Sequence, residues 1–202
     1  FVNYSGAIYY NFNREENVLK EYIPSSNTIH IGVDFNLDPM SAVVSEVKQD
    51  YLYVYDEIVI YGSNTDELVE EINNRYSGKH IFVYPDPASK QRKTSAGGRT
   101  DLSILKNAGY NVRVRNAHPL VRDRINAVNT KLKNTKGVRT LFIANKCKNV
   151  IKSIERQIYK EGTSLPDKEN NYDHMNDALG YLIEFLYPIR THFKPSPPKR
   201  FS

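Results

Sequence analysis

The sequence predicts an α/β fold in which a central mixed sheet is covered by helices on both faces. Strand patterns joined by hairpin turns come first, which is typical of an antiparallel start to a sheet. Alternating helix and strand patterns follow, which favours parallel strands. A chain of 202 residues, 40% of them hydrophobic, can bury one core, so we expect one domain with appendages.

The first strand is predicted over residues 29–36, where the side chains alternate with a period of two. His30, Gly32 and Asp34 then share one face of the strand. Because Gly32 has no side chain, a bulky group can approach the strand closely beside the carboxylate. Asp34 stands where the buried backbone meets solvent, and it is the first candidate functional residue.

Two further strands complete the antiparallel part of the sheet. They are predicted over 41–62, as a β-hairpin with its turn near residues 49–50. A helix over 65–76 follows, with Asn64 or Thr65 as its cap and acidic residues in its first turn.

The parallel part of the sheet begins with a near-continuous apolar run at 80–87, which predicts a strand covered on both faces. The segment 88–100 is basic and rich in glycine and serine, which favours a mobile loop. A helix is predicted over 101–110, stopped by Gly109, and a short strand over 111–116.

The second half of the chain is mainly helical. Helices are predicted over 120–132 and, with an amphipathic pattern, over 147–160. Between them, 138–145 has the pattern of one strand of a hairpin whose turn is 133–137. The last helix is predicted over 173–187 and ends at the proline that follows.

Composition excludes several classes of protein. Cys147 is the only cysteine, so an intramolecular disulfide and a cysteine-rich zinc site are both excluded, and a reducing compartment is expected. No apolar run approaches the roughly 20 residues of a membrane helix, and the N-terminus lacks a signal-peptide pattern. We therefore expect no membrane partner.

Charge is divided unevenly between the two halves. Residues 1–100 hold 9 Lys and Arg against 14 Asp and Glu, whereas residues 101–202 hold 19 against 9. Such a division suits a protein that gathers cations in one place and polyanions in another. An unevenly charged solvated surface gives the same counts, so charge alone does not decide.

Three aspartates stand where the ends of elements can meet. Asp34 and Asp86 follow strands, and Asp177 lies early in the last helix. If the two strands are parallel neighbours, about 4.8 Å apart, their acids can share a divalent ion or flank a pair of ions. Oxygen ligands without thiols favour Mg²⁺ or Mn²⁺. The alternative is that each acid only forms a turn or favours a helix N-terminus.

The helical wheel of the last helix opposes this arrangement. Its apolar residues form a stripe on one side, and Asp177 points nearly opposite to that stripe. His174, Asp177 and Tyr181 face a site only if the other side of the helix is covered as well. The basic middle segments of the chain can supply that cover.

Four short motifs occur in an order that resembles a known family: IHIGVDFNLDPMSAVV, YDEIVIYG, FVYPDPAS and YDHMNDALGYLIEF. With them, the chain resembles the C-terminal nuclease domain of the large terminase subunit of tailed phages, the DNA-packaging motor protein. The tyrosine-rich GAIYYNF resembles the segment that joins the motor and nuclease domains. The resemblance extends over roughly residues 7–187.

This resemblance implies an RNase H-like fold that cuts double-stranded DNA with two metal ions, Mg²⁺ or Mn²⁺. It implies that Asp34, Asp86 and Asp177 are catalytic and bind the metal, with His174 as an accessory ligand in some members. Asp173 lies in the same motif, and its role stays open. We expect Asp34 to be shared by both ions, which activate water and stabilise the leaving 3′ oxygen.

Basic residues beside Asp86 are candidates for contact with the DNA backbone: Lys90, Arg92, Lys93 and Arg99. An ordinary solvated loop is the alternative interpretation of these residues. Nothing in the sequence resembles base readout, so we expect cleavage to be largely independent of sequence.

We expect three segments along the chain. Residues 1–28 are predicted as a lead-in from a missing ATPase domain, 29–190 as the nuclease domain, and 191–202 as a disordered basic, proline-rich tail. Since no phosphate-loop motif occurs, we expect no ATPase activity from this chain by itself. The resemblance further implies that the protein starts and ends genome packaging at the procapsid in the host cytoplasm. Its implied partners are the small terminase subunit, the portal and the ATPase domain of the full-length chain.

Two other functions fit the same residues. One is another RNase H-like nuclease, such as a junction resolvase or a ribonuclease H, which would prefer branched DNA or RNA–DNA hybrids. The other is a DNA-binding or assembly module whose acids are structural, which would bind DNA but neither Mg²⁺ nor Mn²⁺.

Overall fold

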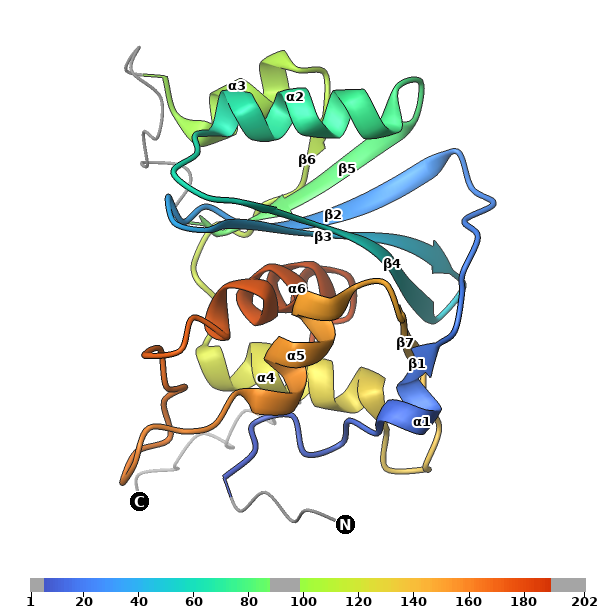
Figure 1. Cartoon of the computed structure of the whole chain (residues 1–202), viewed down its shortest axis with the longest axis vertical. Coiled ribbons are helices and arrows are strands. Elements are labelled where there is room, and N and C mark those ends of the chain that lie inside the picture. Colours follow the sequence, from blue (N-terminus) through green and yellow to red (C-terminus); the bar gives the residue numbers. More distant parts are fainter. Residues whose placement is uncertain (1–5, 88–98, 190–202) are drawn as a thin grey trace, which may run out of the picture.

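A seven-stranded mixed sheet forms the centre of the computed structural model, which describes residues 6–87 and 99–189 (Figure 1). The strands are β1 (Val18–Leu19), β2 (Thr28–Asp34), β3 (Met40–Lys48), β4 (Tyr51–Ile60), β5 (His80–Pro85), β6 (Asn111–Val112) and β7 (Leu141–Ala144). The helices are α1 (Arg14–Asn17), α2 (Thr65–Tyr76), α3 (Asp101–Asn107), α4 (Val121–Leu132), α5 (Lys148–Arg156) and α6 (Asp173–Leu186).

The strands lie in the order β1-β7-β4-β3-β2-β5-β6. β3 is antiparallel to both β2 and β4, whereas β5 is parallel to β2, and β6 is parallel to β5. The prediction that antiparallel strands come first and parallel strands follow is confirmed. β2 ends at Asp34 and β6 spans only two residues, so both strands are shorter than predicted.

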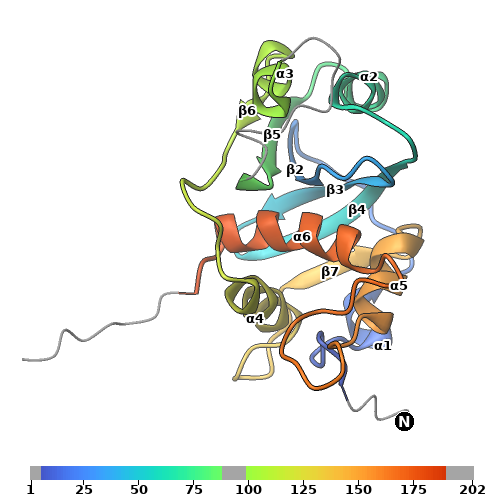
Figure 2. The same ribbon diagram turned by 90° about the vertical axis from the view of Figure 1, so that its left-hand side faces the viewer.

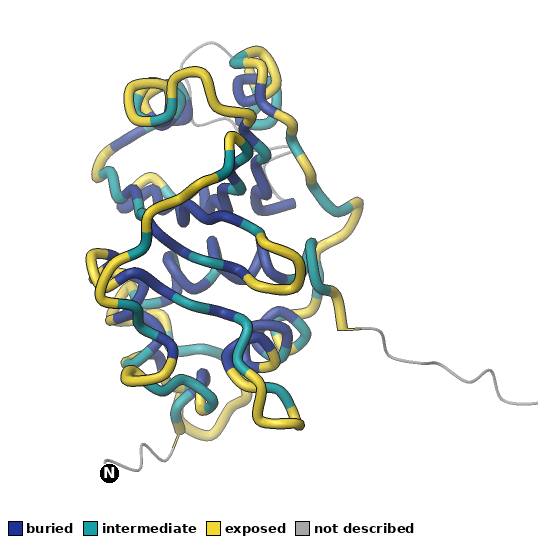
Figure 3. The backbone as a smooth tube through the Cα atoms, turned by 90° about the vertical axis from the view of Figure 1, so that its right-hand side faces the viewer, coloured by how far each residue is buried: buried dark blue, intermediate teal, exposed yellow. Residues whose placement is uncertain are grey.

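Helices cover both faces of the sheet, as predicted. α2 and α3 lie on one face, and α4, α5 and α6 lie on the other (Figures 1 and 2). The central strands are buried between these layers (Figure 3), and each residue from Ile31 to Asp34 of β2 is buried. Within the described part of the chain, no helix combines the length and the apolar character that crossing a membrane requires.

Local sequence explains where helices begin and end. Asn64 caps α2 by accepting a hydrogen bond from the Glu67 backbone N–H at 3.1 Å, and the Glu67 carboxylate accepts one from the Asn64 backbone in return. Gly109 follows α3 with a φ of 85°, a conformation that favours glycine. The cap and the stop that the sequence predicts are both confirmed.

Two predictions about the second half of the chain are wrong. Residues 138–145 do not form a hairpin, because the preceding turn connects α4 to β7, and β7 pairs in parallel with β4 and β1. The helix predicted over 147–160 ends at Arg156. Beyond it, the chain is extended, because the carbonyl oxygen of Gln157 accepts a hydrogen bond from the Ile8 backbone at 3.1 Å.

The segment before β2 packs into the domain. Ile8 and Asn17 are fully buried. The Asn17 side-chain amide donates hydrogen bonds to the backbone carbonyls of Leu132 and Leu141, at 3.1 and 2.9 Å. The described part of residues 1–28, which we predicted as a lead-in segment, thus packs against the rest of the domain.

Helix α6 lies directly against β2 at Gly32. A Cβ atom on Gly32 would lie 2.1 Å from the backbone oxygen of Ala178 and 2.9 Å from Cβ of Leu182. The helix therefore occupies the space that a side chain would need. The bulky group that the sequence predicts beside Asp34 is α6.

Gly32→Ala is expected to lower the free energy of unfolding by more than about 2 kcal/mol, because α6 cannot move away without losing its packing. Gly180→Ala, also in α6, is the matched control. Its Cβ would meet Arg124 at 3.6 Å, an ordinary contact, and alanine favours the helix, so stability should be kept or raised. Urea unfolding followed by circular dichroism measures both. Equal stability of the two variants would contradict the close approach.

Candidate active site

Two acids lie side by side at the carboxyl ends of parallel strands. Asp34 ends β2, and Asp86 follows Pro85 at the end of β5. The Asp86 backbone N–H donates to the carbonyl oxygen of Val33 at 3.2 Å, which continues the parallel pairing by one residue. Asp34 is 8% exposed and Asp86 is 7% exposed. Pairing of β2 with β5 therefore brings together the first two acids that the sequence identified.

His174, in the first turn of α6, contacts Asp34. Its Nδ1 lies 3.0 Å from the Asp34 carboxylate, and its Nε2 lies 3.0 Å from the side-chain nitrogen of Asn36. The Asn36 side-chain oxygen accepts from the Leu37 backbone, so its amide group faces His174 as a donor. A neutral His174 then carries its proton on Nδ1 and donates it to Asp34. This hydrogen bond raises the pKa of His174.

Asp177 lies one turn further along α6, and α4 covers it. Arg124 of α4 pairs with it at 2.9 Å, and the same guanidinium stacks on the ring of Tyr181 at 4.3 Å. Burial raises the pKa of Asp177 to about 6, Arg124 opposes the rise, and the charge of Asp34 adds to it. The helical wheel correctly places Asp177 away from the apolar stripe. The second cover that this position requires is α4.

The pKa of Tyr181 responds to the charges of all three acids. Burial raises its pKa first, Arg124 lowers it, and the charges of Asp177, Asp86 and Asp34 all raise it further. Each acid is therefore close enough to act on the same phenol.

Asp173 is more deeply buried than the other acids of α6. Its side chain is 4% exposed, and one carboxylate oxygen lies 3.2 Å from Lys168. The other oxygen is buried without a hydrogen-bond partner among the described residues, 3.8 Å from His174 Nε2. A buried carboxylate oxygen of this kind can accept a further donor or a cation.

Sequence reasoning missed two basic residues of this site. His118, between β6 and α4, lies 3.4 Å from the Asp86 carboxylate. Arg124 belongs to a basic run in α4 that no motif marks. Neither residue is near the acids in sequence, and only the packing of the segment from β6 to α4 brings them there.

The chemistry of these side chains fits a divalent cation. Buried carboxylate oxygens are the ligands that Mg²⁺ and Mn²⁺ prefer, and burial, with the charge of Asp34 adding to it, raises the pKa of Asp177. The side chains are not yet arranged as a complete set of metal ligands. Among residues 6–87 and 99–189, no three His, Cys, Asp or Glu side chains lie close enough together to hold one ion. Each acid instead faces a basic group of the protein.

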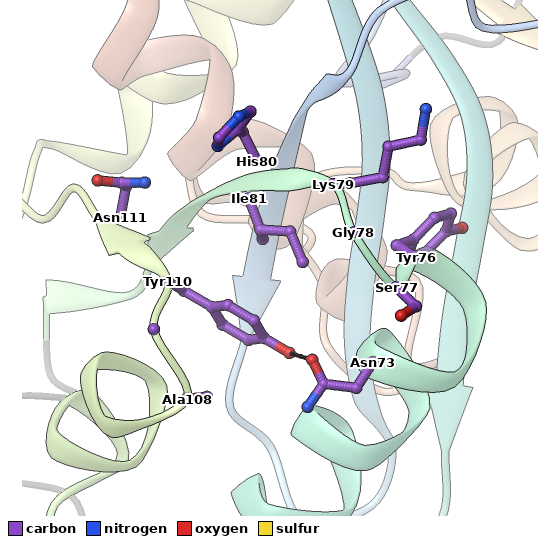
Figure 4. Close-up of a pocket in the computed structure, with 11 residues that line it drawn as sticks. Asn73, Tyr76, Ser77, Gly78, Lys79, His80, Ile81, Ala108, Tyr110 and Asn111 are labelled. Carbon is purple, nitrogen blue, oxygen red and sulfur yellow. Dashed lines mark hydrogen bonds between the residues drawn. The ribbon is translucent and has the colours of Figure 1, made fainter.

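Two cavities adjoin the first turn of α6. One of about 310 Å³ is lined by Arg124, Asp173 and Asp177, and another of about 240 Å³ is lined by Ser41 and His174. A third hollow, shown in Figure 4, lies where α2 and α3 end, and there the Tyr110 hydroxyl donates to the Asn73 side chain at 2.8 Å. This hollow contains none of the candidate site residues.

The DNA-contact residues predicted from the sequence are only partly described. Lys90, Arg92 and Lys93 lie outside the described residues. Arg99 is described, and its guanidinium contacts both carboxylate oxygens of Asp66 at 3.1 Å. Arg99 therefore already has an acidic partner on the surface of α2.

Comparison with known proteins identifies the fold. The family model described as the terminase RNaseH-like domain matches residues 31–185. The large terminase of a thermophilic bacteriophage is similar, with 21% identity, a TM-score of 0.69, and coverage of 89% of this chain but 45% of that chain. No curated protein matches the sequence.

Two separate nuclease domains are also similar. The P22 large terminase nuclease domain has 14% identity and a TM-score of 0.65, with 89% of this chain and 93% of that chain covered. The nuclease domain of the bacteriophage SPP1 large terminase, solved with bound Mn, has 17% identity and a TM-score of 0.55, with coverage of 84% and 96%. At these identities the likeness shows the fold.

Arg124→Met removes the cation beside Asp177 while keeping most of the packing. The pKa of Asp177 is about 6. At higher pH the buried Asp177 carboxylate is charged and needs Arg124 as its partner, whereas at lower pH a proton neutralises it instead. We expect the variant to lose about 1–3 kcal/mol of unfolding free energy at about pH 8 and much less at about pH 5. Urea unfolding at the two pH values measures the difference.

The direction of this pH dependence follows from the raised pKa of Asp177. Because the pKa of folded Asp177 is about 6 rather than 3.8, this group stabilises the fold while it is protonated, and that contribution is lost as the pH rises through about 6. Arg124→Met combined with Asp177→Asn is the control, and it should lose the added pH dependence. An equal loss at both pH values for the single variant would contradict the pairing.

Proposed function

Because the chain belongs to the terminase RNaseH-like domain family, we propose that it is a metal-dependent endonuclease that cuts double-stranded viral DNA during genome packaging. The observation that supports this most is that Asp34 and Asp86 lie at adjacent strand ends, with Asp177 of α6 close enough for the charge of Asp34 to raise its pKa. The sheet register pairs the strand ends that carry Asp34 and Asp86, and α6 carries Asp177 to the same side of the sheet, which supports the proposal.

Each carboxylate has a defined role in this proposal. Asp34, Asp86 and Asp177 would hold two Mg²⁺ or Mn²⁺ ions, with Asp34 as the shared ligand. When bound, the two ions supply an activated water and stabilise the leaving 3′ oxygen. His174 orients the Asp34 carboxylate through its Nδ1, and Arg124 fixes one oxygen of Asp177. Asp173, with one unpartnered oxygen among the described residues, is a further candidate ligand.

The substrate proposal rests on charge and on the family. The C-terminal half of the chain carries 19 Lys and Arg against 9 Asp and Glu, which suits a polyanion. Contacts to phosphates position a duplex without reading its bases, so we propose that cutting is largely independent of sequence.

The other partners that we propose are those of a whole large terminase. This chain spans less than half the length of the large terminase from the thermophilic bacteriophage. We propose that an ATPase domain, the small terminase subunit and the portal act with it at the procapsid in the host cytoplasm, where the nuclease starts and ends packaging.

Asp34→Ala is expected to abolish Mn²⁺-dependent cleavage of plasmid DNA, because it removes the shared ligand, while the fold stays intact. Asp66→Ala, a surface acid on α2, is the matched control and should cut like the wild type. Gel electrophoresis and circular dichroism measure both properties. Undiminished cleavage by Asp34→Ala would place the chemistry elsewhere. A preference for branched DNA or RNA–DNA hybrids over linear duplex would favour a resolvase or ribonuclease H.

Mn²⁺ is expected to raise the Tm of the wild-type protein by about 5–10 °C when it is present at about 100 times its Kd. The rise should shrink at about pH 5, because a proton then competes for Asp177, whose pKa is about 6. Asp86→Asn should remove most of the effect. Differential scanning calorimetry measures it, and an equal rise in the variant would separate metal binding from these acids.

A further inference from the structure

Ser41 stands opposite Asp34 on the neighbouring strand. The antiparallel register of β2 and β3 pairs these residues, so their Cβ atoms are about 5 Å apart on the same face of the sheet. Asp34 therefore lies between Asp86 of β5 on one side and Ser41 of β3 on the other. Ser41 is 1% exposed, and its hydroxyl has no hydrogen-bond partner among the described residues. A buried hydroxyl without a partner is unfavourable unless something else binds it.

This hydroxyl lines the 240 Å³ cavity that also contains His174. The rest of the lining includes Asn149 and Lys152 from α5 and Asn171 from the loop before α6. These side chains offer amide and ammonium donors. A cavity with such donors, one wall of which is the candidate active site, suits an anionic, oxygen-rich ligand.

A basic row on α5 leads away from the cavity. Lys148, Lys152 and Arg156 are exposed and recur every four residues, so they share one side of the helix at steps of about 6 Å. Lys152 lies 5.7 Å from the ring centre of Tyr172, and Arg156 contacts the hydroxyl of that ring at 3.4 Å. These contacts with a neutral ring orient Lys152 and Arg156.

The acids near α5 are already engaged. Glu57 accepts hydrogen bonds from the backbone N–H groups of Asn149 and Val150, at 3.0 and 2.9 Å, at the start of the helix. Glu155 pairs with Arg14 at 3.2 Å. Within residues 6–87 and 99–189, these two acids are therefore not available to neutralise Lys148 and Lys152.

We propose that the Ser41 cavity and the basic row of α5 bind the sugar–phosphate backbone of the DNA strand next to the bond that is cut. The Ser41 hydroxyl and the cavity amides donate to the nucleotide beside Asp34. Lys148, Lys152 and Arg156 contact the phosphates that follow. This inference rests on the proposed nuclease function, and it places the DNA along α5.

The first experiment measures duplex binding without metal. Fluorescence anisotropy of a labelled short duplex in EDTA compares the wild type, Lys152→Ala and the triple variant Lys148→Ala, Lys152→Ala, Arg156→Ala. Each lost phosphate contact should reduce the slope of log K against log salt by about 0.9, so the triple variant should lose about 2–3. Lys106→Ala, exposed on α3 across the sheet, is the matched control and should keep the wild-type slope.

The second experiment uses Ser41→Ala. Because the hydroxyl has no partner in the described protein, its removal should leave the Tm unchanged or raise it. Duplex affinity should fall about two- to tenfold, the value of one hydrogen bond. A serine with only a structural role would leave the affinity unchanged.

The two proposals fail separately. If the triple variant and Ser41→Ala both bind duplex like the wild type, while the wild type still cuts plasmid with Mn²⁺, the α5 surface is overturned and the nuclease function stands. If the wild type binds duplex through α5 but never cuts it with Mn²⁺ or Mg²⁺, the nuclease function is overturned instead. If the wild type does not bind duplex, the α5 surface is overturned.

Discussion

The close packing of α6 on β2 at Gly32 sets where the acids of α6 lie relative to Asp34. Without a Cβ at residue 32, the backbone oxygen of Ala178 can lie where a side chain would be. The first turn of α6 then reaches the end of β2, so that His174 contacts Asp34 at 3.0 Å. A helix held further from the sheet would carry His174 and Asp177 away from Asp34. The absence of a side chain at Gly32 therefore lets the first turn of α6 lie at the candidate site.

Charge is the second constraint, because this packing buries several carboxylates together. A basic side chain lies against each of three acids: His174 against Asp34, His118 against Asp86, and Arg124 against Asp177. Arg124 carries a fixed positive charge, whereas each histidine is charged only when it is protonated. The positive end of the α6 dipole helps as well. Burial nevertheless raises the pKa of Asp177, and the charge of Asp34 adds to the rise. A bound cation would favour the charged form of this carboxylate.

Local signals in the sequence were sufficient for much of this structure. The capping box at Asn64, the glycine stop after α3 and the alternation of β2 all act within a few residues. The meeting of Asp34 and Asp86 was predicted on the condition that their strands are parallel neighbours, and the pairing of β2 with β5 meets that condition. What failed depends on distant contacts. β7 looked like a hairpin strand because its parallel partners lie far away in the chain, and nothing local shows that α4 would cover Asp177.

Ser41, His118 and Arg124 were missed for the same reason, since each is linked to the site only through a neighbour on another element.

The central claim is that Asp34, Asp86 and Asp177 together bind catalytic metal. The most direct measurement is anomalous diffraction from a crystal of this chain soaked in Mn²⁺. We predict manganese bonded to Asp34 and Asp86, with Asp177 turned from Arg124 toward the metal. Manganese bound elsewhere, with these three acids still facing His174, His118 and Arg124, would contradict the claim.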